Sequence, residues 1–321
     1  MGELARLDHG GSAPLPAAYL AILQSPGTQR AYRSTLRALR AEFSPPDAPF
    51  TVAEFDTDAS ADRVTDWFTG RWGQRAPATF NRNLDTLRSA VSYWQDQHWL
   101  STDPTRRLRR RGRTPDRTRA LSHSEIDALF DQDLALRERT LYTLLYESAA
   151  RASEVLALDI EDLDLRNQRA KVRRKGGAVD TIVWQTRTAR LLPRLINGRK
   201  KGPLFLTERR ARVELPASDL CPYTGRARLS YRRAEEIFEQ TTRALANPAI
   251  TEPDELHQAQ GWTLHQLRHS ALTHAAEDGA NTSTLLAFSG HTSVVSLARY
   301  TRVSAEALGR WQTGRAPRRR R

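Results

Sequence analysis

The sequence predicts a mainly α-helical protein of two domains, with a small antiparallel β-hairpin or sheet in the second. The first reason is length, because 321 residues exceed the usual ~100 to 200 residues of a single domain. The second is that apolar residues recur at helical spacing along most of the chain. The third is the segment RAKVRRKGGAVDTIVW, in which strand-forming residues flank a pair of glycines.

The first domain is expected at residues 13–104, after a flexible glycine-rich tail at residues 1–12. The segment 25–43 places apolar side chains on one face of a helix, namely Tyr32, Leu36, Leu39 and Phe43. A second helix opens at Pro77, a residue favoured at the first helical position. It repeats the apolar spacing at Leu84, Leu87, Val91 and Trp94. Together with VTDWF, these segments predict a small helical bundle.

Another face of the helix at 25–43 is basic. Four arginines recur on it at helical spacing, namely Arg30, Arg33, Arg37 and Arg40. A charged face in contact with water is one interpretation, and a row of phosphate ligands is the other.

Residues 105–120 are expected to form an arginine-rich linker between the domains. Eight arginines lie between Arg106 and Arg119, and side chains of like charge repel one another and cannot build a core. Such a segment can instead follow a phosphate backbone. The arginines expected to do so are Arg106, Arg107, Arg109, Arg110, Arg111 and Arg113.

The second domain is expected at residues 121–313, followed by a basic tail at 314–321. Ser122 and Glu125 form a capping box that starts its first helix. The hairpin turns at Gly176 and Gly177, which places Lys175 at the turn. Further helices are expected at 186–195, 230–246, 263–277, 281–288 and 292 to about 300.

The charge of the chain indicates a polyanionic partner. Fifty basic and 37 acidic residues give a net charge of +13, and counterion release favours nucleic acid over a membrane surface. An arginine-rich proteome would explain the choice of arginine over lysine but not this excess. No apolar run long enough to span a membrane and no secretory leader is evident. We therefore expect a cytoplasmic protein without contact to membranes. The single cysteine, Cys221, excludes an internal disulfide and a cysteine-based zinc site.

Two arginines stand among apolar residues. Arg268 shares the apolar face of the helix at 263–277, and Arg151 sits in the alanine-rich segment SAARASEVLAL. A buried guanidinium is costly unless a carboxylate or a phosphate binds its donors. A phosphate shared by both arginines is one interpretation. An internal ion pair is the alternative, with Glu154 available to Arg151.

The arrangement as a whole resembles the tyrosine recombinase, or phage integrase, family of site-specific DNA recombinases. In that family an arginine followed three residues later by an acidic residue corresponds to Arg151 and Glu154, and a hairpin lysine before glycine corresponds to Lys175. The H-x-x-R-H box corresponds to HQLRH, at His265, Arg268 and His269. The Gly-His pair corresponds to Gly290 and His291, and the tyrosine nine residues after the histidine is Tyr300. Ala149 and Ser289 depart from the glycine and leucine that are frequent there.

The resemblance implies a core-binding helical domain, a catalytic domain, and strand exchange through a 3′-phosphotyrosyl intermediate. Chemically, Tyr300 would be the nucleophile, and Arg151, Arg268 and His291 would stabilise the developing negative charge. Lys175 would protonate the leaving 5′ oxygen, and His265 would bind the phosphate and assist proton transfer. Glu154 and His269 would orient these groups. Neither a cofactor nor a metal is implied.

The resemblance also implies partners and alternatives. Double-stranded DNA and a homotetramer on two duplexes are expected, with accessory proteins that set direction, in a bacterial or phage setting near the nucleoid. The segment VSAEALGRW could dock on a neighbouring subunit or on its own core. A type IB topoisomerase, or a regulator that binds DNA without catalysis, would carry some of the same features. No additional arm-binding domain is expected before the helical bundle.

Overall fold

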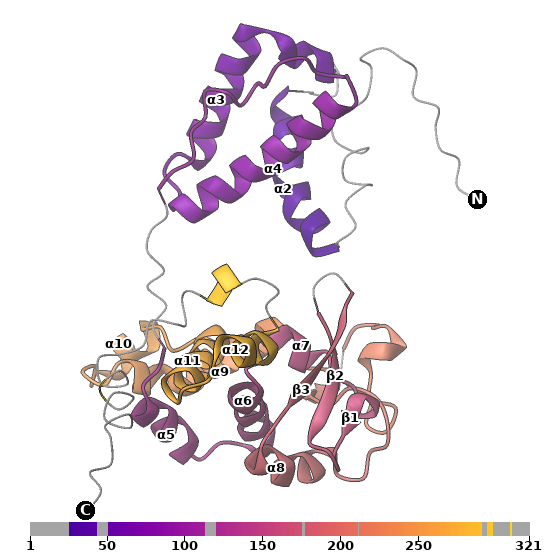
Figure 1. The fold of residues 1–321 in the computed structure, drawn as a ribbon, viewed down its shortest axis with the longest axis vertical. Coiled ribbons are helices and arrows are strands. Elements are labelled where there is room, and N and C mark those ends of the chain that lie inside the picture. The colour runs from indigo at the N-terminus through magenta and orange to yellow at the C-terminus, as the bar shows by residue number, and fades with distance from the viewer. Residues whose placement is uncertain are drawn as a thin grey trace, which may run out of the picture. The chain divides into compact units, whose positions relative to one another are not determined.

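The structure, a computed structural model, describes residues 26–43, 51–112, 120–174, 177–210, 212–290, 294–297 and 309. It is mainly helical with small antiparallel sheets, as the sequence predicts. The chain forms two compact units, Met1–Asp116 and Arg117–Arg321 (Figure 1). Each unit has its own hydrophobic core.

The described residues of the first unit form a helical bundle with a short 3-10 turn. Its elements are α2 (Pro26–Phe43), η1 (Val52–Asp56), α3 (Asp58–Trp72) and α4 (Pro77–Asp96). Helix α2 packs against α4, and the apolar faces expected from sequence are buried, including Leu36, Leu39, Leu84 and Leu87. Aromatic rings fill the rest of the core, with Phe55 and Trp94 stacked at a centroid distance of 6.2 Å.

Residues 105–112 pack on this first unit, which corrects the expectation of an extended linker there. Leu108 is 3% exposed and belongs to the core of the bundle, and its carbonyl accepts a hydrogen bond of 2.6 Å from Arg88. The Asn81 side chain donates a hydrogen bond from Nδ2 to the carbonyl of Arg111 and accepts one at Oδ1 from the backbone N–H of Arg111. The segment is therefore held on the bundle by the burial of Leu108 and by hydrogen bonds to Asn81 and Arg88 on α4.

The second unit surrounds a central helix, α6 (Leu136–Ser148), with other helices and two small sheets. The helices are α5 (His123–Asp131), α7 (Ala152–Leu156), α8 (Thr186–Ile196), α9 (Tyr231–Ala246), α10 (Pro253–Gln258), α11 (Leu264–Glu277) and α12 (Thr282–Ser289). Short 3-10 turns occur at η2 (Ile160–Asp162), η3 (Ala217–Asp219) and η4 (Val294–Leu297). Helix α6 packs against α8 and α11, and the hydroxyl-bearing ring of Tyr142 on α6 is completely buried.

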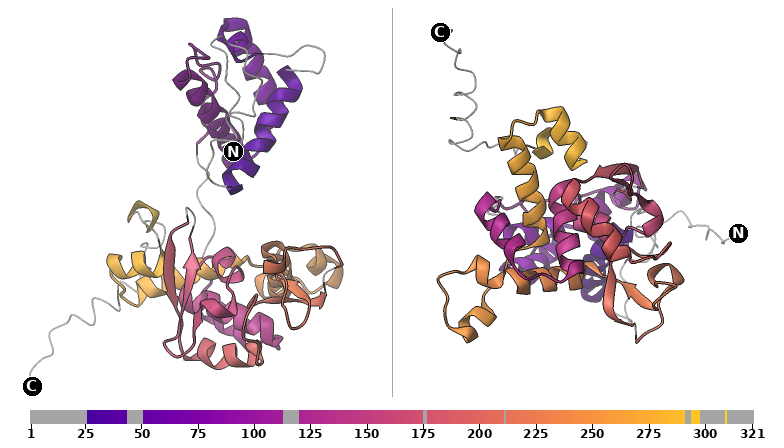
Figure 2. Two further views of the ribbon diagram at one scale, coloured as in Figure 1. Left: turned by 90° about the vertical axis from the view of Figure 1, so that its right-hand side faces the viewer. Right: turned by 90° about the horizontal axis from the view of Figure 1, so that it is seen from below.

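The hairpin expected from sequence is present as β2 (Arg169–Arg173) and β3 (Val179–Val183), which pair antiparallel with Arg173 opposite Val179. A short strand, β1 (Leu163–Asp164), extends it to a three-stranded sheet. In Figures 1 and 2 the hairpin stands at one side of the helical body.

A second sheet, β4 (Leu206–Arg210) with β5 (Arg226–Arg228), is absent from the sequence prediction. Most residues of these strands are polar, and half of all their residues are exposed, so the strands lack the apolar alternation by which a strand is recognised.

Helix boundaries in the second unit follow the capping residues. Ser122 begins α5 and Thr263 begins α11, each through a capping box, and Ser230 and Asn281 cap α9 and α12. The helix expected from 292 to about 300 falls largely outside the described residues. Within that range, the described residues Val294–Leu297 form a 3-10 turn. Among the described helices, none combines the length and the apolar character needed to cross a membrane.

Candidate active site

Arg268 is buried on the apolar face of α11, as the helical spacing predicts. It is 3% exposed and lies between Leu267 and Leu272, which are fully buried. Its guanidinium donates one hydrogen bond to the carbonyl of Ala149 and another, of 2.6 Å, to the carbonyl of Ser289. Both carbonyls stand at helix C-termini, where the helix dipole favours a cation. Backbone oxygens therefore offset part of the cost of burying this charge.

Arg151 is held by the carboxylate of Glu154 one turn further along. It is the N-cap residue of α7, and its Nη1 donates to Glu154 Oε1 at 2.7 Å while its backbone N–H donates to Oε2 at 3.1 Å. The ion pair considered from the sequence is thus present. Glu154 is buried, whereas 37% of the Arg151 side chain remains exposed. The described residues supply no second carboxylate to Arg151, so its outer donors can bind a ligand from solution.

Ala149 brings the two arginines together. It ends α6 in the left-handed conformation, with φ 47° and ψ 21°, so the chain turns sharply toward Arg151 two residues later. Its carbonyl binds Arg268, which places the guanidinium of Arg268 beside the start of α7. The positive φ at this position favours glycine. Alanine has the smallest side chain of the other residues.

Arg174, directly after β2, is a site residue that the sequence did not single out. Its side chain is 8% exposed, and it donates to Asp180 at 2.7 Å, to Glu154 at 3.3 Å and to the carbonyl of Ser289 at 3.3 Å. The available signal was an arginine directly before the predicted Lys175, with an acidic residue across the turn. Its orientation toward α7 depends on the packing of the hairpin, which sequence spacing does not reveal.

The two histidines of the HQLRH segment differ in exposure. His265 is exposed and lies one turn before Arg268, so both can face one ligand. His269 is 8% exposed, and its Nδ1 lies 3.2 Å from the hydroxyl of Thr273 on the same helix. This placement suits the orienting role expected for His269.

Lys175, His291 and Tyr300 lie outside the described residues. Gly290, the last described residue before His291, ends α12 with φ 60°. A Cβ at this position would lie 1.8 Å from Cζ of Arg174, so the backbone there passes directly against that guanidinium. Glycine is therefore required both by the conformation and by the space.

The arginines expected to bind DNA fall into three groups. Arg33, Arg37 and Arg40 on α2 and Arg109 are exposed, whereas the side chain of Arg30 and all of Arg113 lie outside the described residues. The others have partners within the first unit: Arg106 pairs with Asp58, Arg107 with Asp62 and Arg110 with Asp85. Arg111 lies over the ring of Phe80, 4.1 Å from its centroid. Exposed ion pairs contribute little, so DNA contact by these residues stays a prediction.

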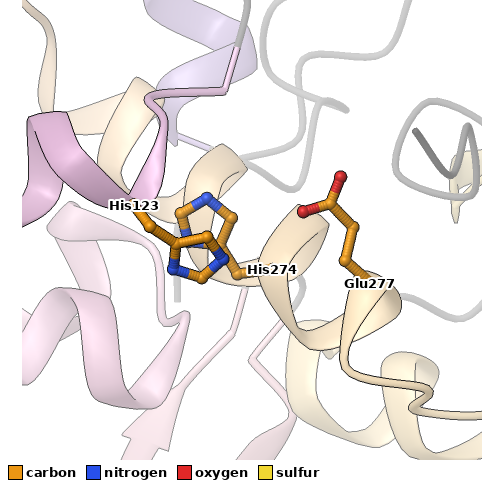
Figure 3. Close-up of side chains that lie close together, drawn as sticks. All are labelled: His123, His274 and Glu277. Carbon is orange, nitrogen blue, oxygen red and sulfur yellow. The ribbon is translucent and has the colours of Figure 1, made fainter. Parts of the chain in front are cut away.

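His123, His274 and Glu277 form a second cluster of titratable groups (Figure 3). The two imidazoles stack at a centroid distance of 3.7 Å with planes 18° apart, and Nδ1 of His274 lies 2.7 Å from the hydroxyl of Tyr146. A metal ion lies near the plane of each imidazole that binds it, and two nearly parallel planes do not meet at a common ion. Burial and the neighbouring His123 lower the pKa of His274. The cluster is therefore better explained as packing between α5 and α11.

The site as described gathers two arginines, one buried and one accessible, with an exposed histidine and a buried carboxylate. Such a set can bind an oxyanion and stabilise additional negative charge on it. The model of the phage integrase family matches residues 119–307, more than half of the chain and all of this site. The chain belongs to the phage integrase family. It is a site-specific DNA recombinase of the tyrosine type, and this membership favours neither the topoisomerase nor the regulator.

Known members of the phage integrase family resemble the chain along most of its length. The tyrosine recombinase XerC of Mycobacterium bovis is 29% identical over 308 residues, covering 90% of this chain and 93% of the relative. XerC of Erythrobacter litoralis is 29% identical over 246 residues, or 74% of this chain and 72% of the relative. XerD of Mycobacterium leprae is 32% identical over 193 residues, or 59% of this chain and 55% of the relative.

Solved structures of the phage integrase family share the fold. The Tn1549 transposon integrase in complex with a circular intermediate DNA matches with a TM-score of 0.62 and 16% identity, over 94% of this chain and 98% of the other. A lambda integrase dimer bound to a core site matches with a TM-score of 0.62 and 16% identity, over 89% and 75% of the two chains. The fold class expected from sequence is thus confirmed.

Proposed function

We propose that this recombinase cleaves and rejoins double-stranded DNA through a covalent 3′-phosphotyrosyl intermediate formed by Tyr300. The observation that carries the proposal is the junction of Arg151 and Arg268 around Ala149. One guanidinium is locked by backbone carbonyls, and the other, fixed by Glu154, keeps donors exposed. A scissile phosphate bound there would meet cations that need no rearrangement, which is the condition for strong electrostatic stabilisation.

The proposed chemistry assigns each remaining group a step. The Tyr300 oxygen gives up its proton, with His265 assisting the transfer, and attacks phosphorus. The phosphodiester bond to the 5′ oxygen breaks, and the leaving oxygen takes a proton from Lys175. Because free tyrosine has a pKa of ~10, the positive field of Arg151, Arg268 and His291 is needed to stabilise the phenolate as it forms. His265 hydrogen-bonds the phosphate, and Glu154 and His269 hold their neighbours in place. The 5′ hydroxyl of a second strand then reverses the step.

The proposed partner is duplex DNA, bound by both units. The core-binding unit, residues 13–104, offers the exposed arginines of α2, and the catalytic unit, residues 121–313, carries the site. Structures related in fold were solved with DNA, including XerH bound to its difH substrate and the lambda integrase dimer on a core site. We propose a homotetramer on two duplexes in the cytoplasm, with direction set by accessory proteins.

Covalent capture on genomic DNA tests this proposal. The purified chain is incubated with DNA of the producing organism, protein is trapped under denaturing conditions, and the attached ends are sequenced. We expect protein on 3′ ends at a small set of related sites, and none with Tyr300→Phe, which keeps the ring but lacks the nucleophilic oxygen. Equal adduct yields from the wild type and Tyr300→Phe would refute the mechanism.

A further inference from the structure

Arg174 joins three elements that meet at the active site. It directly follows β2, and its donors reach Asp180 on β3, Glu154 on α7 and the carbonyl of Ser289 at the end of α12. The side chain is almost completely buried. A single guanidinium with five donors in a planar fork can serve three acceptors at once.

Two of the three acceptor groups of Arg174, the Glu154 carboxylate and the Ser289 carbonyl, also bind the two catalytic arginines. Glu154 accepts hydrogen bonds from both Arg151 and Arg174, and the carbonyl of Ser289 accepts hydrogen bonds from both Arg268 and Arg174. A continuous chain of contacts therefore runs from Arg151 through Glu154, Arg174 and Ser289 to Arg268.

We propose that Arg174 is a positioning residue that sets the separation and orientation of Arg151 and Arg268 for a single phosphate. The inference rests on the proposed function, because it concerns the geometry of the same cleavage step. Arg174 itself is turned inward and does not contact DNA. It acts through Glu154 and through the end of α12, so its loss changes where the two catalytic guanidinium groups lie and leaves their chemistry intact.

Charge gives Arg174 a second effect on Arg151. Glu154 is 5% exposed, and a buried carboxylate needs cationic partners. With Arg174 present, the Glu154 oxygens are shared between two guanidinium groups. Without Arg174, the described residues leave Arg151 as the sole side-chain cation on Glu154, so the carboxylate holds Arg151 more tightly and competes with the phosphate. Both effects slow cleavage without removing any contact to DNA.

The backbone at Gly290 lies against the guanidinium of Arg174. The 1.8 Å between a hypothetical Cβ at Gly290 and Cζ of Arg174 shows that the chain leading to His291 lies directly against the guanidinium. Arg174 thus also borders the segment that continues toward His291 in the sequence. This steric contact adds to the hydrogen bond that Arg174 donates to the carbonyl of Ser289, the residue before Gly290.

Single-turnover cleavage separates positioning from the other roles that Arg174 could have. The probe is a nicked duplex carrying the site mapped by covalent capture, and the measured quantities are the rate constant and amplitude of adduct formation at saturating DNA, the Kd, and its salt dependence. For Arg174→Gln we expect the rate constant to fall at least about tenfold, because misplacement by about 1 Å can cost a hundredfold. Kd and its salt slope should stay within about twofold, since no phosphate contact is lost.

The matched control is Arg173→Gln, which removes the same charge one position earlier, on the exposed side of β2. We expect its cleavage rate constant to equal that of the wild type. Arg174→Lys keeps the charge but replaces the fork by one ammonium, so an intermediate rate is expected. Asp180→Asn leaves Arg174 in place and weakens its hold on β3, and a loss of about twofold to fivefold is expected. These two variants decide the question if Arg174→Gln fails to fold.

Three results would overturn the inference. A purely structural role would reduce the amplitude of adduct formation, as molecules unfold, and leave the rate constant of the folded fraction unchanged. A direct phosphate contact would instead weaken Kd and reduce the salt slope by about one. Wild-type rate constants in both Arg174→Lys and Asp180→Asn would also contradict positioning. Absence of a Tyr300-dependent adduct in the wild type, by contrast, would overturn the proposed function and this inference with it.

Discussion

At the scale of single residues, the active site is built around charges that the fold has buried. The sequence predicts that Arg268 is buried, because helical spacing alone puts it among leucines. It does not predict the partners, which are two backbone carbonyls from helices far away in the chain. The Arg151–Glu154 pair was predictable because three residues separate its members, whereas Arg174 depends on long-range packing that no local pattern encodes.

The carbonyl partners of Arg268 make its replacement costly. Arg268→Ala takes the Arg268 donor from the buried carbonyl of Ala149 and removes one of the two arginine donors of the Ser289 carbonyl. An unsatisfied buried acceptor costs roughly 1–3 kcal/mol, less what is regained by no longer burying a charge. We expect the free energy of unfolding of the second unit to fall by about 2–4 kcal/mol, measured by urea denaturation. Arg173→Ala, on an exposed strand face, should change it by less than about 0.5 kcal/mol. A loss below about 1 kcal/mol for Arg268→Ala would show that these hydrogen bonds are not structural.

His274 makes stability depend on pH. Its pKa is lowered by burial, and the adjacent His123 lowers it further. A depressed pKa means that the unfolded chain binds the proton more readily, so the stabilisation is complete above about pH 6.5 and is lost as pH falls through the folded-state pKa. We expect the free energy of unfolding to decrease from about pH 7 to about pH 5. In His274→Gln this decrease should be smaller, and an identical pH profile would contradict the assignment.

At the scale of elements, the sequence predicts the helices and strands that are marked by local features, namely capping residues and apolar periodicity. The boundaries of α5 and α11 follow from their capping boxes, and the β2–β3 hairpin follows from two glycines between strand formers. The β4–β5 sheet was missed because most of its residues are polar. The expectation of an extended linker is wrong for residues 105–112, because the five arginines of this segment conceal the single leucine that packs in the core.

Leu108 tests the corrected position of residues 105–112. Its burial in the core of the first unit predicts that Leu108→Ala lowers the free energy of unfolding of that unit by about 2–4 kcal/mol. Hydrogen exchange of the full chain can assign the loss to the first unit. The control is Arg109→Ala, the adjacent exposed position, which should have little effect on stability. Equal stability of the two variants would restore the linker interpretation.

The end of α12 and the end of β2 should be energetically coupled through Gly290 and Arg174. Gly290→Ala introduces a side chain at φ 60° and against the guanidinium, so a loss of about 2 kcal/mol or more is expected. Arg174→Ala removes the obstructing group. In a double-mutant cycle, Gly290→Ala should lower the free energy of unfolding by about 1 kcal/mol less in the Arg174→Ala background than in the wild type. Additive losses would mean that the two residues do not meet in solution.

At the scale of the whole molecule, charge and architecture agree with a protein that binds DNA. The net charge of +13 predicts a nucleic acid partner, and the family membership accounts for it. The order and spacing of the motifs in the sequence indicate this family, and in the proposed mechanism the motif residues reach one phosphate. The sequence could not supply the network that aligns these residues, since Glu154, Arg174 and Ser289 come from three separate elements.

The most direct test of the central claim is the identity of the residue that becomes linked to DNA. Covalent complexes are digested with nuclease and protease, and the peptide that retains a nucleotide is sequenced by mass spectrometry. The account predicts a 3′-linked nucleotide on Tyr300, formed at a rate that falls by at least about 100-fold in Arg151→Ala and in Arg268→Ala. A nucleotide on any other residue, or an undiminished rate without those arginines, would contradict it.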